Sequence, residues 1–208
     1  MDISCPGHSC FRLRSGNVTL LTDPFPDSLG ISWGHPEAHI VTVSNSHPNH
    51  SNISQVAGNP KVVQGPGEYE IRRFYIRGIP TNTAEDDFQN TAYRIYAEGI
   101  TLCHLGDLAH SLPARVVTEL RASDVLFLPV GGGCTLSAAG AAALVHLLEP
   151  TIVVPMHFAL PGLQTDLEGA EPFLRALGAG DTVPKATLSV SRSSLPRERT
   201  VTVFQSSS

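Results

Sequence analysis

Residues 39–51 read His-Ile-Val-Thr-Val-Ser-Asn-Ser-His-Pro-Asn-His-Ser and join an apolar run to a polar loop. The apolar part, His39–Val43, has the composition of a strand that is buried on both faces. The loop that follows is made of small polar residues and carries two imidazoles three positions apart, His47 and His50. Loops that leave the ends of buried strands often hold the sites of layered α/β proteins. The stretch therefore predicts a layered α/β fold with a site at a strand end.

Two interpretations of this loop remain open from its own residues. The two imidazoles can converge on one metal ion, with Pro48 restricting the backbone between them. Alternatively, the loop is the N-terminus of a helix, with Ser and Asn as caps and both histidines in solvent.

The rest of the chain divides into a strand-rich first half and a second half in which helices and strands alternate. The expected strands are 3–5, 10–14, 18–22, 39–43, 61–64, 68–71, 74–79, 91–98, 100–105, 125–129, 152–155, 187–190 and 201–204. The expected helices are 113–120, 137–148 and 169–177, with Ser111 and Thr135 as candidate caps of the first two. This order predicts one mixed α/β layered domain over residues 1–208.

Composition narrows the classes of partner. The chain has 208 residues with 14 Lys and Arg against 19 Asp and Glu, a net charge of −5, and no basic run. We therefore expect neither a nucleic-acid nor a membrane partner, but a small-molecule ligand or substrate, and the sequence leaves a homo-oligomer open. The N-terminus lacks the pattern of a secretory signal, so the expected location is the cytoplasm, where the four cysteines would be reduced thiols.

Three further strand ends carry residues that bind metals. Asp23 follows strand 18–22, Asp107 follows strand 100–105, and His157 follows strand 152–155. With the loop at His47 and His50, four strand ends each supply a histidine or an aspartate, which are donors that zinc prefers. The alternative is that both aspartates only cap turns.

Seven short motifs occur together in this chain, in an order that points to a known family. They are Gly7-His8-Ser9-Cys10-Phe11, Thr22-Asp23-Pro24-Phe25, His47-Pro48-Asn49-His50, Gly65-Pro66-Gly67-Glu68-Tyr69-Glu70-Ile71, His104-Leu105-Gly106-Asp107-Leu108, Pro129-Val130-Gly131-Gly132 and Pro155-Met156-His157. The chain resembles the metallo-β-lactamase superfamily, in its branch of small prokaryotic metal-dependent hydrolases related to the ascorbate-6-phosphate lactonase group. The resemblance covers essentially the whole chain. It implies an αββα sandwich with two central sheets, helices outside and a zinc centre at the sheet edge.

The resemblance assigns metal-ligand positions to His47, His50, Asp107 and His157. The chain departs from the family signature His-x-His-x-Asp-His, because Asn45 stands in place of the first histidine and Asn49 in place of the aspartate. The loop after Ile79, where the family has another histidine, contains none, and Thr83 is the replacement by position.

Sorting these ligands by site predicts one zinc ion at most. The resemblance implies two metal sites that share Asp107. Of the ligands of the first site, this chain keeps only His47 and the shared Asp107. Of the ligands of the second site, it keeps His50, Asp107 and His157. Two histidines and a carboxylate with an open fourth position are a usual catalytic zinc set. We expect His50 and Asp107 to serve catalysis, and His47 to stay in its loop rather than turn onto this ion.

The other candidate residues are assigned supporting roles. Asp23 is expected to hold a ligand histidine, as carboxylates near zinc sites often do. His8 would line the pocket or lie hydrogen-bonded in the core, and His104 would lie behind Asp107 or pack in its strand. Gly131–Gly133 suggests a phosphate cradle, but it lacks the Lys-Ser/Thr of a nucleotide-binding loop, so no nucleotide is expected.

Three functional hypotheses follow. The first is a hydrolase with one zinc ion that acts on a small ester, lactone or phosphorylated metabolite. The second is a non-catalytic relative that has lost its metal centre and binds a ligand or partner. The third is a closed structural metal site.

Overall fold

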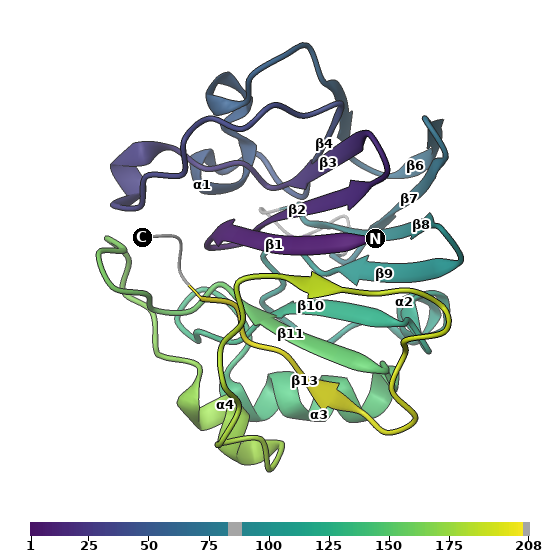
Figure 1. Ribbon diagram of the computed structural model, residues 1–208. Coiled ribbons are helices and arrows are strands. Elements are labelled where there is room, and N and C mark those ends of the chain that lie inside the picture. The colour runs from purple at the N-terminus through teal and green to yellow at the C-terminus, as the bar shows by residue number, and fades with distance from the viewer. Residues whose placement is uncertain (83–88, 206–208) are drawn as a thin grey trace.

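The computed structural model describes residues 1–82 and 89–205, and in this part of the chain two β-sheets pack face to face (Figure 1). The first sheet has the order β12-β1-β2-β3-β4-β5 and the second the order β13-β11-β10-β9-β8-β7-β6. Strands of the first sheet are β1 (Asp2–Gly7), β2 (Cys10–Ser15), β3 (Val18–Thr22), β4 (Ile40–Val43), β5 (Lys61–Gln64) and β12 (Leu188–Ser189). Strands of the second are β6 (Gly67–Ile71), β7 (Phe74–Pro80), β8 (Thr91–Ala97), β9 (Ile100–His104), β10 (Val125–Pro129), β11 (Ile152–Met156) and β13 (Thr200–Val201).

Strand directions gather the expected site residues at one edge of the sandwich. In the first sheet β1, β3 and β4 run the same way, since β1 and β3 are each antiparallel to β2, and β3 is parallel to β4. In the second sheet β9, β10 and β11 are parallel. Backbone hydrogen bonds join the ends of the two sheets, from the amide of His157 to the carbonyl of His8 and from Thr91 to Ser44. The carboxyl ends of these strands therefore meet at a shared edge.

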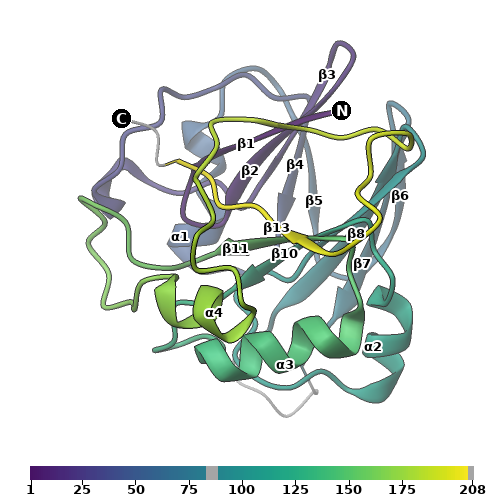
Figure 2. The same cartoon turned by 60° about the horizontal axis from the view of Figure 1, so that its bottom comes forward.

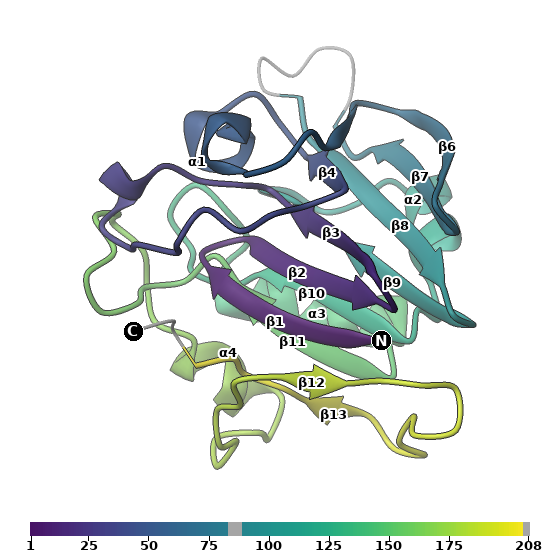
Figure 3. The same ribbon diagram turned by 45° about the horizontal axis from the view of Figure 1, so that its top comes forward.

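The interior of the sandwich is apolar. Alternating side chains of both sheets meet there, among them Phe11, Tyr93 and Phe127, all fully buried, and the rings of Phe11 and Phe127 lie 4.2 Å apart. Figure 3 shows β1, β2 and β3 in front of the second sheet. Burial of this kind stabilises the fold by about 25 cal/mol per Å² of apolar surface removed from water.

Helices cover the outer face of the second sheet. These are α2 (Ala114–Leu120), α3 (Ala138–Leu148) and α4 (Glu171–Ala176), which Figure 2 shows side by side beneath it. Their apolar faces bury Leu120, Val145 and Phe173 against the sheet. Within the residues described, no helix is long and apolar enough to cross a membrane.

The outer face of the first sheet is covered differently. Phe25, Leu29 and Ile31, from the segment between β3 and β4, pack on it with Val41. The regular structure on this side is limited to short pieces, namely η1 (Asp27–Leu29), α1 (Pro48–Ser51) and η2 (Ile53–Gln55). The expected two-sheet sandwich is confirmed, but its helical layer over the first sheet is reduced to single turns.

The expected helix caps were wrong. The Oγ of Ser137 accepts a hydrogen bond of 3.2 Å from the amide of Gly140 and caps α3, and Pro113 occupies the cap position of α2. Thr135 instead donates from its hydroxyl to the carbonyl of Gly132, within the turn before α3. A hydroxyl two residues upstream of a cap can form such a local turn, so composition alone does not distinguish the two roles.

Candidate metal centre

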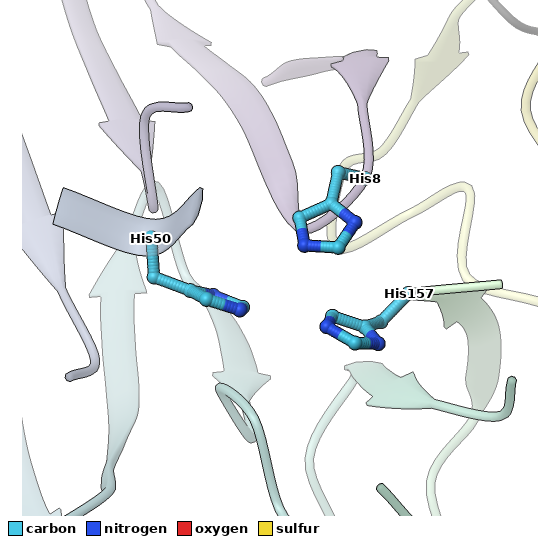
Figure 4. Close-up of side chains that lie close together, drawn as sticks. All are labelled: His8, His50 and His157. Carbon is cyan, nitrogen blue, oxygen red and sulfur yellow. The ribbon is translucent and has the colours of Figure 1, made fainter. Parts of the chain in front are cut away.

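Three histidines from three different elements point toward one another at the shared edge (Figure 4). His8 lies in the turn between β1 and β2, His50 in α1, and His157 directly after β11. Each offers a ring nitrogen within 4.8 Å of the other two. The ring centroids are 4.2 Å apart for His8 and His157, 5.1 Å for His8 and His50, and 5.3 Å for His50 and His157.

Asp107 completes this group from the loop after β9. Its Oδ2 lies 3.7 Å from Nε2 of His50, and its Oδ1 lies 3.4 Å from Nε2 of His157. The loop can approach this closely because residue 106 is a glycine with φ of 62°. A Cβ at position 106 would lie 2.3 Å from Oδ1 of Asn90 and 2.5 Å from Cβ of Ser44. Gly106 is therefore required where the ends of the two sheets meet.

Asp23 holds His50 in position. Its Oδ2 lies 2.9 Å from Nδ1 of His50 and accepts a 2.6 Å hydrogen bond from the hydroxyl of Ser44, whose amide donates to Oδ1 at 2.8 Å. All three side chains are buried. A carboxylate on one imidazole nitrogen directs the other nitrogen outward, which is the usual arrangement behind a metal-binding histidine.

The position of His157 depends on a glycine that follows the neighbouring strand β10. The amide of Gly131 donates to the carbonyl of His157 at 3.0 Å, and a Cβ on residue 131 would lie 2.3 Å from that oxygen. Gly131, the first glycine of the run after β10, therefore allows close packing against the end of β11. His8, Asp23 and His157 have left-handed φ values of 53°, 39° and 52°. Such strain in residues other than glycine is concentrated at functional sites.

His47, the other expected ligand, lies apart from the three-histidine group. Its Nδ1 accepts a 3.2 Å hydrogen bond from the amide of Asn49 and caps α1, and its ring lies 6.3 Å from that of His50. The side chain of Asn45 is built into the same loop, accepting from the amide of His47 at 2.9 Å and donating to the hydroxyl of Ser44 at 3.0 Å. Asn49 lines the pocket in front of His50. Thr83 lies outside the described residues.

His104 is the buried histidine behind the group. Its Nε2 lies 2.9 Å from the carbonyl of Ser9, and its Nδ1 accepts from the amide of Gly106 at 3.2 Å. Both ring nitrogens of His104 therefore have backbone partners, one in the β1–β2 turn and the other in the loop after β9. His104 therefore ties the β1–β2 turn to the Asp107 loop and offers no free nitrogen to a ligand.

Burial decides the protonation of the ring nitrogens. It lowers the pKa of His157 to about 3 and also lowers the pKa of His8, with repulsion among the neighbouring imidazoles adding to both shifts. Burial would also lower the pKa of His50, but the hydrogen bond and charge of Asp23, with the charge of Asp107, raise it instead. Burial raises the pKa of the Asp107 carboxyl against the influence of His50. His8 and His157 are therefore neutral, which is the form that binds metal.

Several polar atoms of this group are buried without a partner. In the described part of the chain these are both ring nitrogens of His8, Nδ1 of His157 and Oδ1 of Asp107. Buried polar atoms are almost always hydrogen-bonded, so four unpaired atoms in one cluster indicate a missing partner. Imidazole and carboxylate are donors that zinc and related divalent ions prefer. The residues present therefore fit a metal ion.

A pocket of about 960 Å³ opens in front of these residues. It is bounded by the His47 loop, by the Asp107 loop, by residues 133–135 and by residues 165–167. The residues that line it in the described ranges include no lysine or arginine. Cys134 stands at its rim, with Sγ within 4.8 Å of a His157 nitrogen and an Asp107 oxygen.

Two supporting residues were not found from the sequence. Asn90 is buried and accepts a 2.9 Å hydrogen bond from the amide of Asp107, and its own amide donates to the carbonyl of Leu105 at 2.9 Å. Ser44 carries the two bonds to Asp23 described above. Both are single polar residues next to a strand, and no local pattern distinguishes them from ordinary loop residues.

Comparison with known proteins agrees with this architecture. The family described as "Beta-lactamase superfamily domain" matches residues 2–157. A curated relative, the UPF0173 metal-dependent hydrolase of Lysinibacillus sphaericus, is 26% identical over 203 residues, covering 80% of this chain and 89% of the relative. A UPF0173 protein of Pyrococcus furiosus is 29% identical over 183 residues, covering 76% and 83%.

Solved structures give the same result. A metallo-β-lactamase superfamily protein of Thermotoga maritima superposes with a TM-score of 0.80 at 33% identity, covering 98% of this chain and 97% of its own. A protein from Parabacteroides distasonis, at 18% identity, shares the fold with a TM-score of 0.68, covering 99% and 93%. The seven sequence motifs, the two-sheet sandwich and these matches agree that the chain belongs to the metallo-β-lactamase superfamily.

Proposed function

We propose that this chain is a metal-dependent hydrolase that binds one divalent ion, zinc by donor preference, and acts on a small ester or lactone. The observation that carries the proposal is the position of Asp107, whose two oxygens lie 3.7 and 3.4 Å from Nε2 of His50 and His157 at the inner end of a pocket. The names of the relatives support it, since the Lysinibacillus protein is called a metal-dependent hydrolase and the Thermotoga protein is proposed to be Zn-dependent.

His50, Asp107 and His157 would hold the ion. When bound, a divalent ion polarises a substrate carbonyl toward attack by water. Asp23 fixes the tautomer of His50 by occupying Nδ1, so that Nε2 is left for the ion. Asn90 holds the backbone of the Asp107 loop.

Asp107 is also the carboxylate placed to hold a proton from the attacking water. Both oxygens of Asp23 are occupied by Ser44 and His50, whereas Oδ1 of Asp107 has no partner within the described residues. The side chain of Asp107 is 12% exposed and faces the pocket.

The pocket lining favours an uncharged substrate. A phosphate group is usually held by arginine or lysine, and the described lining has neither. The sequence of residues 83–88 adds none. We therefore place neutral esters and lactones before the phosphorylated metabolites that the sequence left open.

A non-catalytic binding protein is the second candidate, and Asn45 is the observation that favours it. Asn45 stands where the family signature has its first metal-binding histidine. Its side-chain amide is held by hydrogen bonds to the backbone of His47 and the hydroxyl of Ser44, so this position now belongs to the structure of the loop. Under this hypothesis the pocket binds a small ligand without turning it over.

One experiment separates the two. Protein loaded with Zn²⁺ is assayed against a panel of neutral esters and lactones and their phosphorylated analogues, beside Asp107→Asn and the exposed control Asp181→Asn. Hydrolysis that is lost in Asp107→Asn and kept in Asp181→Asn supports the hydrolase. Metal-loaded protein that binds panel members without turnover would favour the binding protein.

A further inference from the structure

Among the described residues, His8 is the one side chain with two buried polar atoms that lack a hydrogen-bond partner. It is 2% exposed, and neither of its ring nitrogens has a hydrogen-bond partner in the described residues. Burying one polar group without a partner costs roughly 1–3 kcal/mol. His104 shows the contrasting case, because both of its nitrogens meet backbone groups.

Packing alone does not account for an imidazole at this position. The His8 ring meets Phe25 edge-on at 6.5 Å, a contact that a phenyl ring would make without unpaired nitrogens. Its nearest ring neighbours are instead two other imidazoles, those of His157 and His50. Neutral imidazoles gathered with unpaired nitrogens form a site that binds cations.

We propose that His8 is itself a metal ligand, and that His8, His50 and His157 bind one ion together, with Asp107 beside them. This inference rests on the proposed function only in placing an ion at this edge. The ring nitrogens lie within 4.8 Å of one another, and ligands of one tetrahedral zinc ion lie about 3.4 Å apart, so small ring rotations close the site.

His8 thereby supplies an imidazole that the signature loop has lost. Oδ1 of Asn45 and Nδ1 of His47 are both engaged in hydrogen bonds within that loop. His8 arrives from the first sheet, and the hydrogen bond from the amide of His157 to its carbonyl fixes its backbone. The ion would thus lie toward the β1–β2 turn, bound by residues of both sheets.

The test compares single asparagine variants. His8→Asn removes the imidazole and keeps a residue that tolerates the left-handed φ of 53°. His35→Asn is the matched control, because His35 is exposed and has a φ of 48°. His47→Asn tests the family ligand. Zn²⁺ affinity is measured by competition with a chelator, and urea unfolding of each metal-free variant shows that it is folded.

The expected result is a loss of Zn²⁺ affinity in His8→Asn of more than about 100-fold, beyond the 10–100-fold effect of groups that only orient ligands. His35→Asn and His47→Asn should bind as the wild type does. In histidine-selective ¹⁵N NMR, Zn²⁺ should shift a ring nitrogen of His8 together with those of His50 and His157.

Two results would overturn the inference. These are a loss of less than about tenfold in folded His8→Asn, or His8 nitrogens that stay unshifted while those of His50 and His157 respond. Such a result leaves the hydrolase proposal standing. Conversely, His8-dependent Zn²⁺ binding without turnover of any ester or lactone would contradict the hydrolase proposal and support this inference.

Discussion

The backbone amide of His157 donates a hydrogen bond of 3.1 Å to the carbonyl oxygen of His8, and both residues have left-handed backbones, with φ of 52° and 53°. This bond joins the end of β11 in the second sheet to the β1–β2 turn of the first. The two imidazoles consequently lie with centroids 4.2 Å apart. The candidate metal centre is therefore a property of sheet packing, and it forms only when both sheets have closed on their shared apolar core.

Metal stoichiometry is the first prediction. Protein loaded with excess Zn²⁺ and then desalted should retain one ion per chain by elemental analysis, because one group of unpaired donors lies at the described edge. Bound zinc should also raise the thermal midpoint, since a ligand that binds only the native state stabilises it. Two retained equivalents would contradict this prediction.

Asp23→Asn is expected to weaken both stability and metal binding. The carboxylate accepts from Ser44 and holds His50 in a fully buried setting, and an amide cannot accept at both ends. The free energy of unfolding should fall by about 1–3 kcal/mol, and Zn²⁺ affinity by about 10–100-fold. Urea unfolding and chelator competition measure the two effects, with exposed Asp181→Asn as the control. A variant as stable as the control would show that the three hydrogen bonds contribute little.

The strands were predicted well because their signals are local. The apolar run predicted at residues 39–43, observed as Ile40–Val43, and the turn residues at 15–17 define their strands without reference to the rest of the chain. The reduced helical cover of the first sheet was not foreseen. Phe25, Leu29 and Ile31 lie on that face from irregular segments, and their spacing carries no helical or strand period.

The residues of the candidate metal centre could be predicted only in part, because some of them come together only through long-range packing. His50, Asp107 and His157 follow strands or belong to a recognisable motif, so their approach to one another could be expected. The closeness of His8 depends on how the first sheet lies on the second, which no local pattern records. Asn90 is a similar case, because its hydrogen bond to Asp107 spans 17 positions in the chain.

Glu98 provides a pH-dependent prediction away from the site. The hydroxyl of Ser15, at 2.5 Å, and then the terminal amine of Met1, at 2.9 Å, hold the pKa of Glu98 below its usual value. A depressed pKa in the folded state stabilises above the unfolded pKa, and this contribution is lost as the pH falls through the folded value. Because Glu98 is 43% exposed, solvent screening limits the effect to below about 1 kcal/mol.

The measurement compares urea midpoints of wild type and Glu98→Gln at about pH 7 and about pH 3, on either side of the ordinary glutamate pKa. At about pH 7 the urea midpoint of the wild type should be higher than that of Glu98→Gln. At about pH 3 the difference between the two midpoints should be smaller. An equal difference at both values would contradict the assignment to Glu98.

Cys134 should be the cysteine that thiol reagents modify first in the native protein. It is the exposed one of the four, at the pocket rim, whereas Cys10 and Cys103 are buried and Cys5 is half-buried. Burial raises the pKa of all four thiols, to about 12 for Cys5 and Cys103, so exposure is what distinguishes Cys134. Labelling near neutral pH followed by mass spectrometry should give one adduct per chain, and none at early times in Cys134→Ser. Rapid modification of a second thiol would show that the sandwich opens more readily than its burial implies.

Asn49→Asp should strengthen the metal centre. Asn49 lines the pocket one residue before His50, and its amide side chain is a poor donor compared with a carboxylate. The substitution adds a negative charge and an oxygen donor beside His50. We therefore expect Zn²⁺ affinity to rise by about tenfold or more, which corresponds to about 1.4 kcal/mol of binding free energy or more. The matched control is Asn17→Asp, which changes the net charge equally in the exposed turn between β2 and β3, at the far end of the hairpin from His8. Chelator competition on both variants decides the matter. If Asn49→Asp binds Zn²⁺ no more tightly than Asn17→Asp, position 49 does not face the ion, and the metal must lie entirely on the side of His8 and His157.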